Sequence, residues 1–320
     1  LVEIGDGVAG TDTANATLTF DDLDQGDTAE LDLTSVGWTS NAGSLFTNVL
    51  SYGSVEKAAN SNDVVYTLDD TNSDVQALQV GETLTDSVVV RATSNGETVD
   101  HTVTFTITGT NDAPVVSGAT VIADAFEAGV DSSGDAASAG PAVGAADALF
   151  VNTSDVDNVV SSFIVSRAAL VGQELVAVTS ESTASNNGLV VIGDFGTLTV
   201  GADGSYSYVI DDNNATVQAL DETASETETF SIEVSDGAGG TVTETLFIRL
   251  NGTNDAPTVS GADIGDTAIE AGVDSSGDAV SGSSATDGVG ALFANASDLD
   301  DAISSLVVSQ ITASSNVSSD

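Results

Sequence analysis

Acidic side chains are the residues of this sequence whose types and spacing could do chemistry. The chain has 320 residues, with 50 Asp and Glu against 4 Lys and Arg and a formal net charge of −46. Two motifs that gather carboxylate and amide oxygens recur: Asp-x-Asp at 22–24, 155–157 and 298–300, and Asn-Asp-Ala-Pro at 111–114 and 254–257. Calcium takes about 6–8 oxygen ligands from such groups. These motifs therefore predict divalent-cation sites, whereas most other acids are expected only to solvate the surface.

The same composition argues against several classes of function. Nucleic acid and anionic lipid both need a positive surface, which this chain lacks. There is no Cys, so neither a disulfide framework nor a thiolate metal site is expected. His101 is the only imidazole, and neither a Gly-x-Ser-x-Gly nor a His-Glu-x-x-His motif occurs. We therefore predict a non-enzymatic protein.

No membrane insertion is expected either, because no apolar run approaches ~18 residues. The first residues, Leu1–Ile4, contain no basic segment, so no signal peptide is expected.

Self-similarity at a spacing of 143 residues is the strongest feature of the chain. Gly109–Pro114 recurs as Gly252–Pro257, and Glu127–Asp135 recurs as Glu270–Asp278. A unit that recurs at a fixed spacing indicates tandem domains. We predict a first repeat at 1–112, a second at 113–255, and the N-terminal part of a third at 256–320.

The local pattern within each repeat is typical of β-structure. Thr102–Thr108 alternates apolar and polar residues with period two, as a half-buried strand does. Turn residues separate further strands and predict two hairpins, Gly196–Val200 with Tyr206–Ile210 and Thr229–Val234 with Thr241–Leu250. One helical turn is expected at Pro141–Phe150, because Pro favours the first position of a helix. Many short strands separated by turns indicate a β-sandwich.

Several motifs together resemble a known family. Gly-Thr-Leu-Thr-Val at 196–200, Val-Gln-Ala-Leu at 217–220 and Gly-Thr-Asn-Asp-Ala-Pro at 252–257 resemble the VCBS repeat of large bacterial surface proteins. The resemblance implies an all-β fold of tandem cadherin-like or immunoglobulin-like β-sandwiches in an extended rod. It also implies type I secretion, a place at the bacterial cell surface, and a structural role in cell adhesion, biofilm or filaments.

The resemblance further implies Ca²⁺ between consecutive domains. At the first junction the ligands would be Asn111, Asp112, Asp155, Asp157 and Asp236, together with Glu3 and Asp69 or Asp70 from the preceding domain. At the second junction they would be Asn254, Asp255, Asp298 and Asp300, together with Glu127 and Asp211 or Asp212. The partners implied are neighbouring repeats of the same chain, and also like subunits or surface glycans.

Two other functions fit the sequence. Thr102, Thr104, Thr106 and Thr108 share one strand face and could bind ice or a glycan, although an outward polar face is the simpler interpretation. Trp38 and Tyr52 could form a sugar platform, although core positions are the simpler expectation. Alternatively, the incomplete segment 256–320 could be donated to a neighbouring subunit and build a filament.

Overall fold

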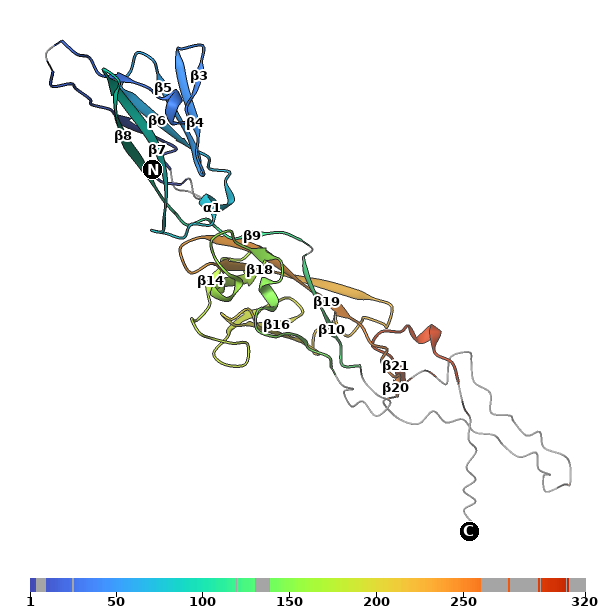
Figure 1. Cartoon of the computed structure of the whole chain (residues 1–320). Coiled ribbons are helices and arrows are strands. Elements are labelled where there is room, and N and C mark those ends of the chain that lie inside the picture. Colours follow the sequence, from blue (N-terminus) through green and yellow to red (C-terminus); the bar gives the residue numbers. More distant parts are fainter. Residues whose placement is uncertain are drawn as a thin grey trace.

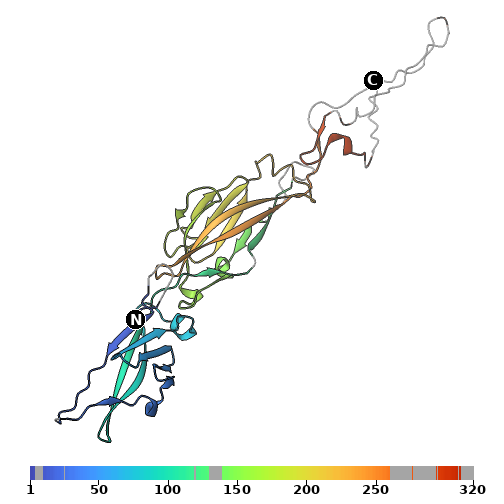
Figure 2. The ribbon, with the colours of Figure 1, turned by 90° about the horizontal axis from the view of Figure 1, so that it is seen from above.

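The computed structural model describes residues 1–3, 10–24, 26–118, 120–129, 139–259, 276, 293, 295–308 and 310. Within these residues most elements are strands, and the helices are single turns. The strands build β-sandwiches that follow one another along an elongated chain, with the first sandwich (blue) at one end (Figures 1 and 2). This confirms the predicted all-β fold of tandem β-sandwiches in an extended rod.

The first sandwich consists of two antiparallel sheets. One sheet has the order β1-β6-β5-β4-β3 and the other has the order β2-β7-β8. Single turns at η1 (Thr34–Val36) and α1 (Ser73–Gln76) connect its strands. The strands are β1 (Thr13–Thr17), β2 (Glu30–Leu31), β3 (Thr39–Asn41), β4 (Leu45–Val49), β5 (Gly53–Ala58), β6 (Asp63–Leu68), β7 (Thr83–Ser94) and β8 (Glu97–Thr108).

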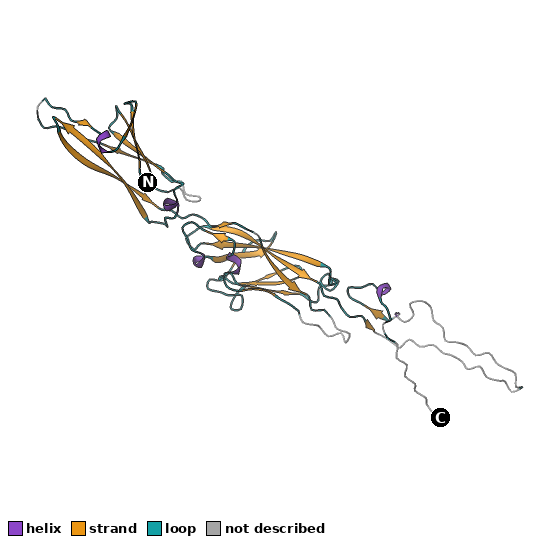
Figure 3. Ribbon diagram, turned by 45° about the vertical axis from the view of Figure 1, so that its right-hand side comes forward, coloured by secondary structure: helices purple, strands orange, loops and turns teal. Residues whose placement is uncertain are grey.

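The second sandwich is larger and uses the same plan. Its two main sheets have the orders β10-β19-β18-β13-β14 and β11-β17-β16-β15, and a small β12-β9 pair lies near its start. Figure 3 shows that strands dominate this unit and that its helices are short turns. Turns η2 (Ala148–Phe150) and η3 (Val160–Ser162) flank β12. The strands are β9 (Val115–Val116), β10 (Val121–Phe126), β11 (Ala142–Gly144), β12 (Thr153–Ser154), β13 (Ile164–Leu170), β14 (Val176–Ala177), β15 (Leu189–Ile192), β16 (Gly196–Val200), β17 (Tyr206–Ile210), β18 (Ser225–Ser235) and β19 (Thr241–Asn251).

Only the beginning of the next unit belongs to the described residues. There β20 (Thr258–Val259) pairs with β21 (Ala296–Ser297), and η5 (Ile303–Ser305) follows. The β20–β21 pair corresponds to the β12–β9 pair of the second sandwich, 143 residues earlier. Residues 260–275, 277–292, 294, 309 and 311–320 of the predicted third repeat lie outside the described residues.

Alternating side chains explain both cores. Along β19, Leu246, Ile248 and Leu250 are fully buried, while the residues between them face outward. Both predicted hairpins form, β16 with β17 and β18 with β19, and β8 contains the predicted Thr102–Thr108 strand. Trp38 lies in the first core and its Nε1 donates to the Val89 carbonyl at 2.9 Å, so the core interpretation of Trp38 is correct.

The helical turn predicted at Pro141–Phe150 is only partly correct. Residues Ala142–Gly144 form strand β11, and only Ala148–Phe150 is helical. Ala142 is buried and pairs with Tyr208 of β17. This long-range pairing outweighs the local preference of Pro for a helix start.

A buried carboxylate joins the two sheets of each sandwich. In the first, Asp86 accepts from the Tyr66 hydroxyl at 2.8 Å and from the backbone amides of Ser51 and Tyr52. In the second, Glu228 accepts from the Tyr208 hydroxyl at 2.6 Å and from the Phe195 amide. These repeated networks fix the strands from which the junction loops extend.

Candidate metal centres at the repeat junctions

The three Asp-x-Asp loops share one local geometry. The first Asp of each loop accepts a hydrogen bond from the backbone amide of the second, which defines an Asx turn. The Oδ1–N distances are 2.8 Å for Asp22 and Asp24, 3.0 Å for Asp155 and Asp157, and 3.3 Å for Asp298 and Asp300. One carboxylate oxygen of the first Asp is therefore fixed by the loop.

The first junction brings residues of both sandwiches together. Asp157, in the loop after β12, accepts from the Asp112 amide of the linker at 3.3 Å through Oδ2. Its backbone carbonyl accepts from Gln79 Nε2 of the first sandwich at 3.0 Å. Asp157 is therefore buried between the linker and the base of the preceding domain.

Glu3 provides the carboxylate of the preceding domain at the same place. It is fully buried and accepts from Gln76 Nε2 at 3.1 Å and from the Thr110 amide at 3.2 Å. Burial, together with the nearby carboxylates of Asp112, Asp70 and Asp157, raises the pKa of Glu3 to about 7. Acids of both domains thus act on one another across this junction.

The second junction repeats this arrangement around its own basal glutamate. Glu127 is buried and accepts from Gln218 Nε2 at 2.5 Å and from the Thr253 amide at 3.4 Å. Burial raises the pKa of Glu127 to about 7, and the nearby carboxylates of Asp255, Asp212 and Asp300 add to the shift. The Asp255 amide donates to Asp300 Oδ2 at 3.2 Å, as Asp112 does to Asp157.

The junctions contain carboxylate oxygens with no hydrogen-bond donor. Asp155 Oδ2 and Asp300 Oδ1 are buried and accept no hydrogen bond. Burial and the adjacent Asp155 carboxyl raise the pKa of Asp157, and burial and Asp298 act in the same direction on Asp300. Buried carboxylates normally have donors or a counter-ion. These oxygens fit a hard divalent cation, which would supply the missing positive charge.

The two alternative acids at each base lie in different surroundings. Asp70 and Asp212 are partly buried and act on Glu3 and Glu127, respectively. Asp69 and Asp211 are exposed and accept from their own turns, Asp69 from the Thr71 hydroxyl at 2.7 Å and Asp211 from the Asn213 amide at 3.0 Å. Asp69 and Asp211 are therefore not brought into the clusters.

Asp236 lies at the first junction, but both of its carboxylate oxygens already accept hydrogen bonds from the protein. Its Oδ1 accepts from the amides of Ala238, Gly239 and Gly240 in the β18–β19 turn, and its Oδ2 accepts from Asn111 Nδ2 at 2.7 Å. Asp236 thus attaches the linker to this turn. At the second junction Asn254 is exposed, and its Nδ2 donates to the Asp255 carbonyl at 2.6 Å.

Some participants were not found from the sequence. Gln76 and Gln218 fix the basal glutamates, and the repeated Val-Gln-Ala-Leu motif was a signal for both. Asp301 lies with Asp298 and Asp300, the three offering oxygens within 4.8 Å of one another.

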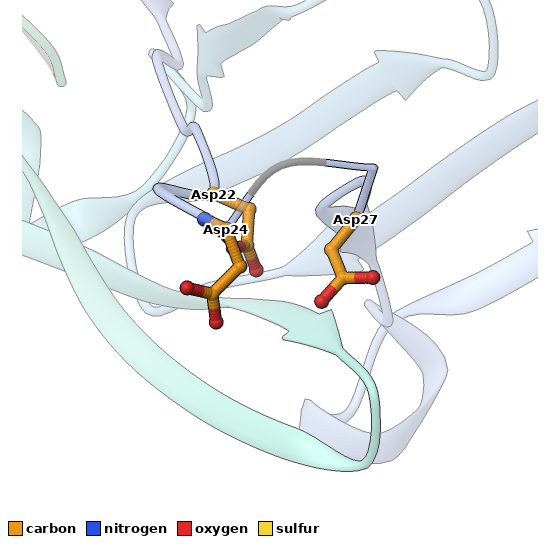
Figure 4. A group of neighbouring side chains, drawn as sticks. All are labelled: Asp22, Asp24 and Asp27. Atoms are coloured by element: carbon orange, nitrogen blue, oxygen red, sulfur yellow. Dashed lines mark hydrogen bonds between the residues drawn. The ribbon is translucent and has the colours of Figure 1, made fainter.

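A comparable cluster occurs at the far end of the first sandwich. Asp22, Asp24 and Asp27 likewise offer oxygens within 4.8 Å of one another (Figure 4). The Asp-x-Asp motif at 22–24 was the sequence signal for this cluster.

Solved structures of cadherin domains are similar to this chain. Mouse cadherin-23 domains EC22–24 show 13% identity and a TM-score of 0.41, covering 94% of this chain and 74% of that one. Protocadherin gamma B2 domains 3–6 show 14% identity and a TM-score of 0.33, covering 71% of this chain. The chain spans 46% of that structure and 35% of the protocadherin gamma B2 fragment with domains 1–5.

No protein-family model matches the sequence, and no curated protein matches it. Among the described residues, no helix is both long and apolar enough to cross a membrane.

Proposed function

We propose that this chain is a non-enzymatic spacer whose junctions are made rigid by Ca²⁺, from an extracellular bacterial adhesin of the VCBS type. The observation that carries the proposal is the pairing of Glu3 with Asp157 and of Glu127 with Asp300. In each pair, burial raises the pKa of the basal glutamate to about 7, and the carboxylate of the following domain adds to that shift. Protein folds rarely bury like charges together unless a cation joins them.

The residues proposed to hold the ion come from both sides of each junction. At the first they are Glu3, Asp70, Asp112, Asp155 and Asp157, with Asp236 and Asn111 fixing the linker. At the second they are Glu127, Asp212, Asp255, Asp298 and Asp300. Asp301 is a further candidate at the second junction, and Asn254 is a candidate through its side-chain oxygen.

The mechanical consequence follows from electrostatics. Two unit charges about 4 Å apart repel by roughly 4 kcal/mol at an effective dielectric constant near 20. Without a cation, ionised junction acids therefore favour separated or bent domains. A bound Ca²⁺ replaces this repulsion with bonds from both domains, so the preferred state becomes a straight, stiff junction.

The experiment is a comparison of the whole chain in Ca²⁺ and in chelator. We expect a higher melting temperature in calcium and a longer particle by small-angle X-ray scattering. Mg²⁺ at the same concentration is the control for ionic strength, because Mg²⁺ demands near-ideal octahedral geometry and loses its water reluctantly. Identical melting and scattering curves in calcium and in chelator would remove the ion from the proposal.

The domain boundaries 1–112, 113–255 and 256–320 belong to the same proposal. They fall inside each Asn-Asp-Ala-Pro motif, between Asp and Ala, so that the linker itself contributes ligands. Type I secretion and a role in biofilm or surface filaments rest on the motif resemblance alone.

A second candidate is direct binding of ice or a glycan by the first sandwich. Thr102, Thr104 and Thr106 are exposed on β8, and Thr85 lies directly opposite Thr106. An ice-affinity assay and a glycan array on the whole chain test it, and binding abolished by Thr104→Ala would favour this function over the spacer.

A further inference from the structure

The outer face of the β11-β17-β16-β15 sheet contains no charged side chain. Register defines two cross-strand rows on this face. One row consists of Val143, Ser207, Thr199 and Val190, and the other consists of Val209, Thr197 and Ile192. We call these seven residues the neutral face. It lies on the side of the second sandwich opposite β18 and β19 (Figure 1).

The apolar members of the neutral face are open to solvent. Exposed fractions are 67% for Val143, 58% for Val190, 78% for Ile192 and 56% for Val209. These side chains flank Thr197 and Thr199 of the central strand β16, with Val190 and Ile192 on one side and Val143 and Val209 on the other. The opposite outer face of the same sandwich also exposes Ile122 and Phe126, but it carries the Arg249–Asp124 and Arg167–Glu233 ion pairs.

The fold itself does not require this composition. Gly53 of β5 and Gly196 of β16 occupy the same place, each packed against the hydroxyl of the buried Tyr on the next strand. Counting from these glycines, Glu56 of the first sandwich corresponds to Thr199 of the second. The first sandwich therefore has an acid, Glu56, at the centre of the equivalent face, whereas the second sandwich has the neutral Thr199 at that position.

We propose that the neutral face is the contact surface between two copies of this chain. Electrostatics favours a second copy as the occupant. Two chains that each carry a net charge of −46 repel one another and can approach closely only where neither presents an acid. The acids of this sheet lie in its turns and at strand ends, as Asp194, Asp203 and Asp211 do. Two sheet faces of Val, Ile and Thr also pack well on one another.

The size of the face sets the strength of the contact. Four strands about 4.8 Å apart and rows about 3.4 Å per residue give a patch on the order of 300 Å² per copy. A stable interface buries about 800 Å² per partner, so this contact is weak, with a dissociation constant on the order of 0.1–1 mM. Chains crowded on one surface reach about millimolar local concentrations, at which such a contact forms. The contact does not depend on calcium.

Sedimentation of the whole chain over a range from about 10 μM to 1 mM tests the proposal. We expect reversible dimers that become more populated as NaCl is raised, because salt screens the repulsion between the two chains. Thr199→Glu introduces the acid of the first sandwich and should weaken dimers by at least ~100-fold, because like charges meet in the contact. Thr227→Glu adds the same charge to β18, on the opposite outer face, and should leave dimers unchanged.

A second variant removes apolar surface without adding charge. Val190→Thr with Val209→Thr introduces the first-sandwich residues Thr47 and Thr67, so both changes suit the fold, and it should weaken dimers by about tenfold. A chain that stays monomeric at about 1 mM would overturn the proposal. Association that is as strong in Thr199→Glu as in wild type would also overturn the proposal. Calcium-induced association through the acidic surface would be one such result.

Discussion

Replacing Glu3 by Gln should change the stability of the first sandwich in opposite directions with and without calcium. Glu3 is fully buried, and its pKa is about 7 against an ordinary value of 4.5. Above pH ~7 the folded chain in chelator must hold this carboxylate ionised among other acids. The neutral Gln removes that charge and should stabilise the calcium-free form. In calcium the same change removes a ligand and should destabilise the protein.

The magnitude follows from linkage. A pKa raised from 4.5 to about 7 corresponds to at most about 3 kcal/mol, which favours the folded state fully below pH ~4.5 and is lost as the pH rises through ~7. The Gln amide group cannot accept from both Gln76 and Thr110, which costs about 1 kcal/mol. We therefore expect Glu3→Gln to be about 1–2 kcal/mol more stable than wild type in chelator near pH 8, and no more stable near pH 4.

Urea unfolding followed by tryptophan fluorescence is the assay. Trp38 is the only Trp and lies in the first core, so its signal reports this sandwich alone. Glu56→Gln, on the exposed face of β5, is the matched control and should change the free energy of unfolding little in either condition. If Glu3→Gln lowers stability equally in calcium and in chelator, Glu3 is a structural acceptor and the reasoning is refuted.

Three further outcomes are expected. Asp157→Asn should abolish most of the calcium-dependent rise in melting temperature, whereas Asp69→Asn should leave it intact; equal effects of the two variants would contradict the assignment of the cluster. Calcium affinity, measured by calorimetry, should rise as the pH increases from about 6 to 8, because Glu3 and Glu127, each with a pKa of about 7, must release their protons. A flat pH profile would show that these two acids are not ligands. Tyr208→Phe should lower the unfolding temperature of the second sandwich, at a cost of about 1–3 kcal/mol, because the buried Glu228 loses a donor; an unchanged calorimetric transition would contradict this role.

Much of the fold followed from the sequence because its signals are local and repeated. Alternation along Thr102–Thr108 and the turn between Val200 and Tyr206 specify strands and a hairpin without reference to distant residues. The strand at Ala142–Gly144 could not be predicted from the sequence, because its partner Tyr208 lies more than 60 residues away in the chain. No local pattern reports that pairing.

The candidate site was predictable in composition but not in detail. The repeated Asp-x-Asp and Asn-Asp-Ala-Pro motifs identified both linkers and Asp157 and Asp300. The choice between Asp69 and Asp70 depended on Thr71, whose hydroxyl holds Asp69 in its own turn. Asp236 was expected as a ligand, but the β18–β19 turn uses most of its acceptor capacity, which only the folded turn reveals.

The most direct test of the central claim is an anomalous-difference map from crystals of the whole chain grown in calcium. The account predicts a strong peak at each junction, bounded by Glu3, Asp112 and Asp157 at the first and by Glu127, Asp255 and Asp300 at the second. Well-ordered junctions without peaks, their acids protonated or hydrated, would contradict it.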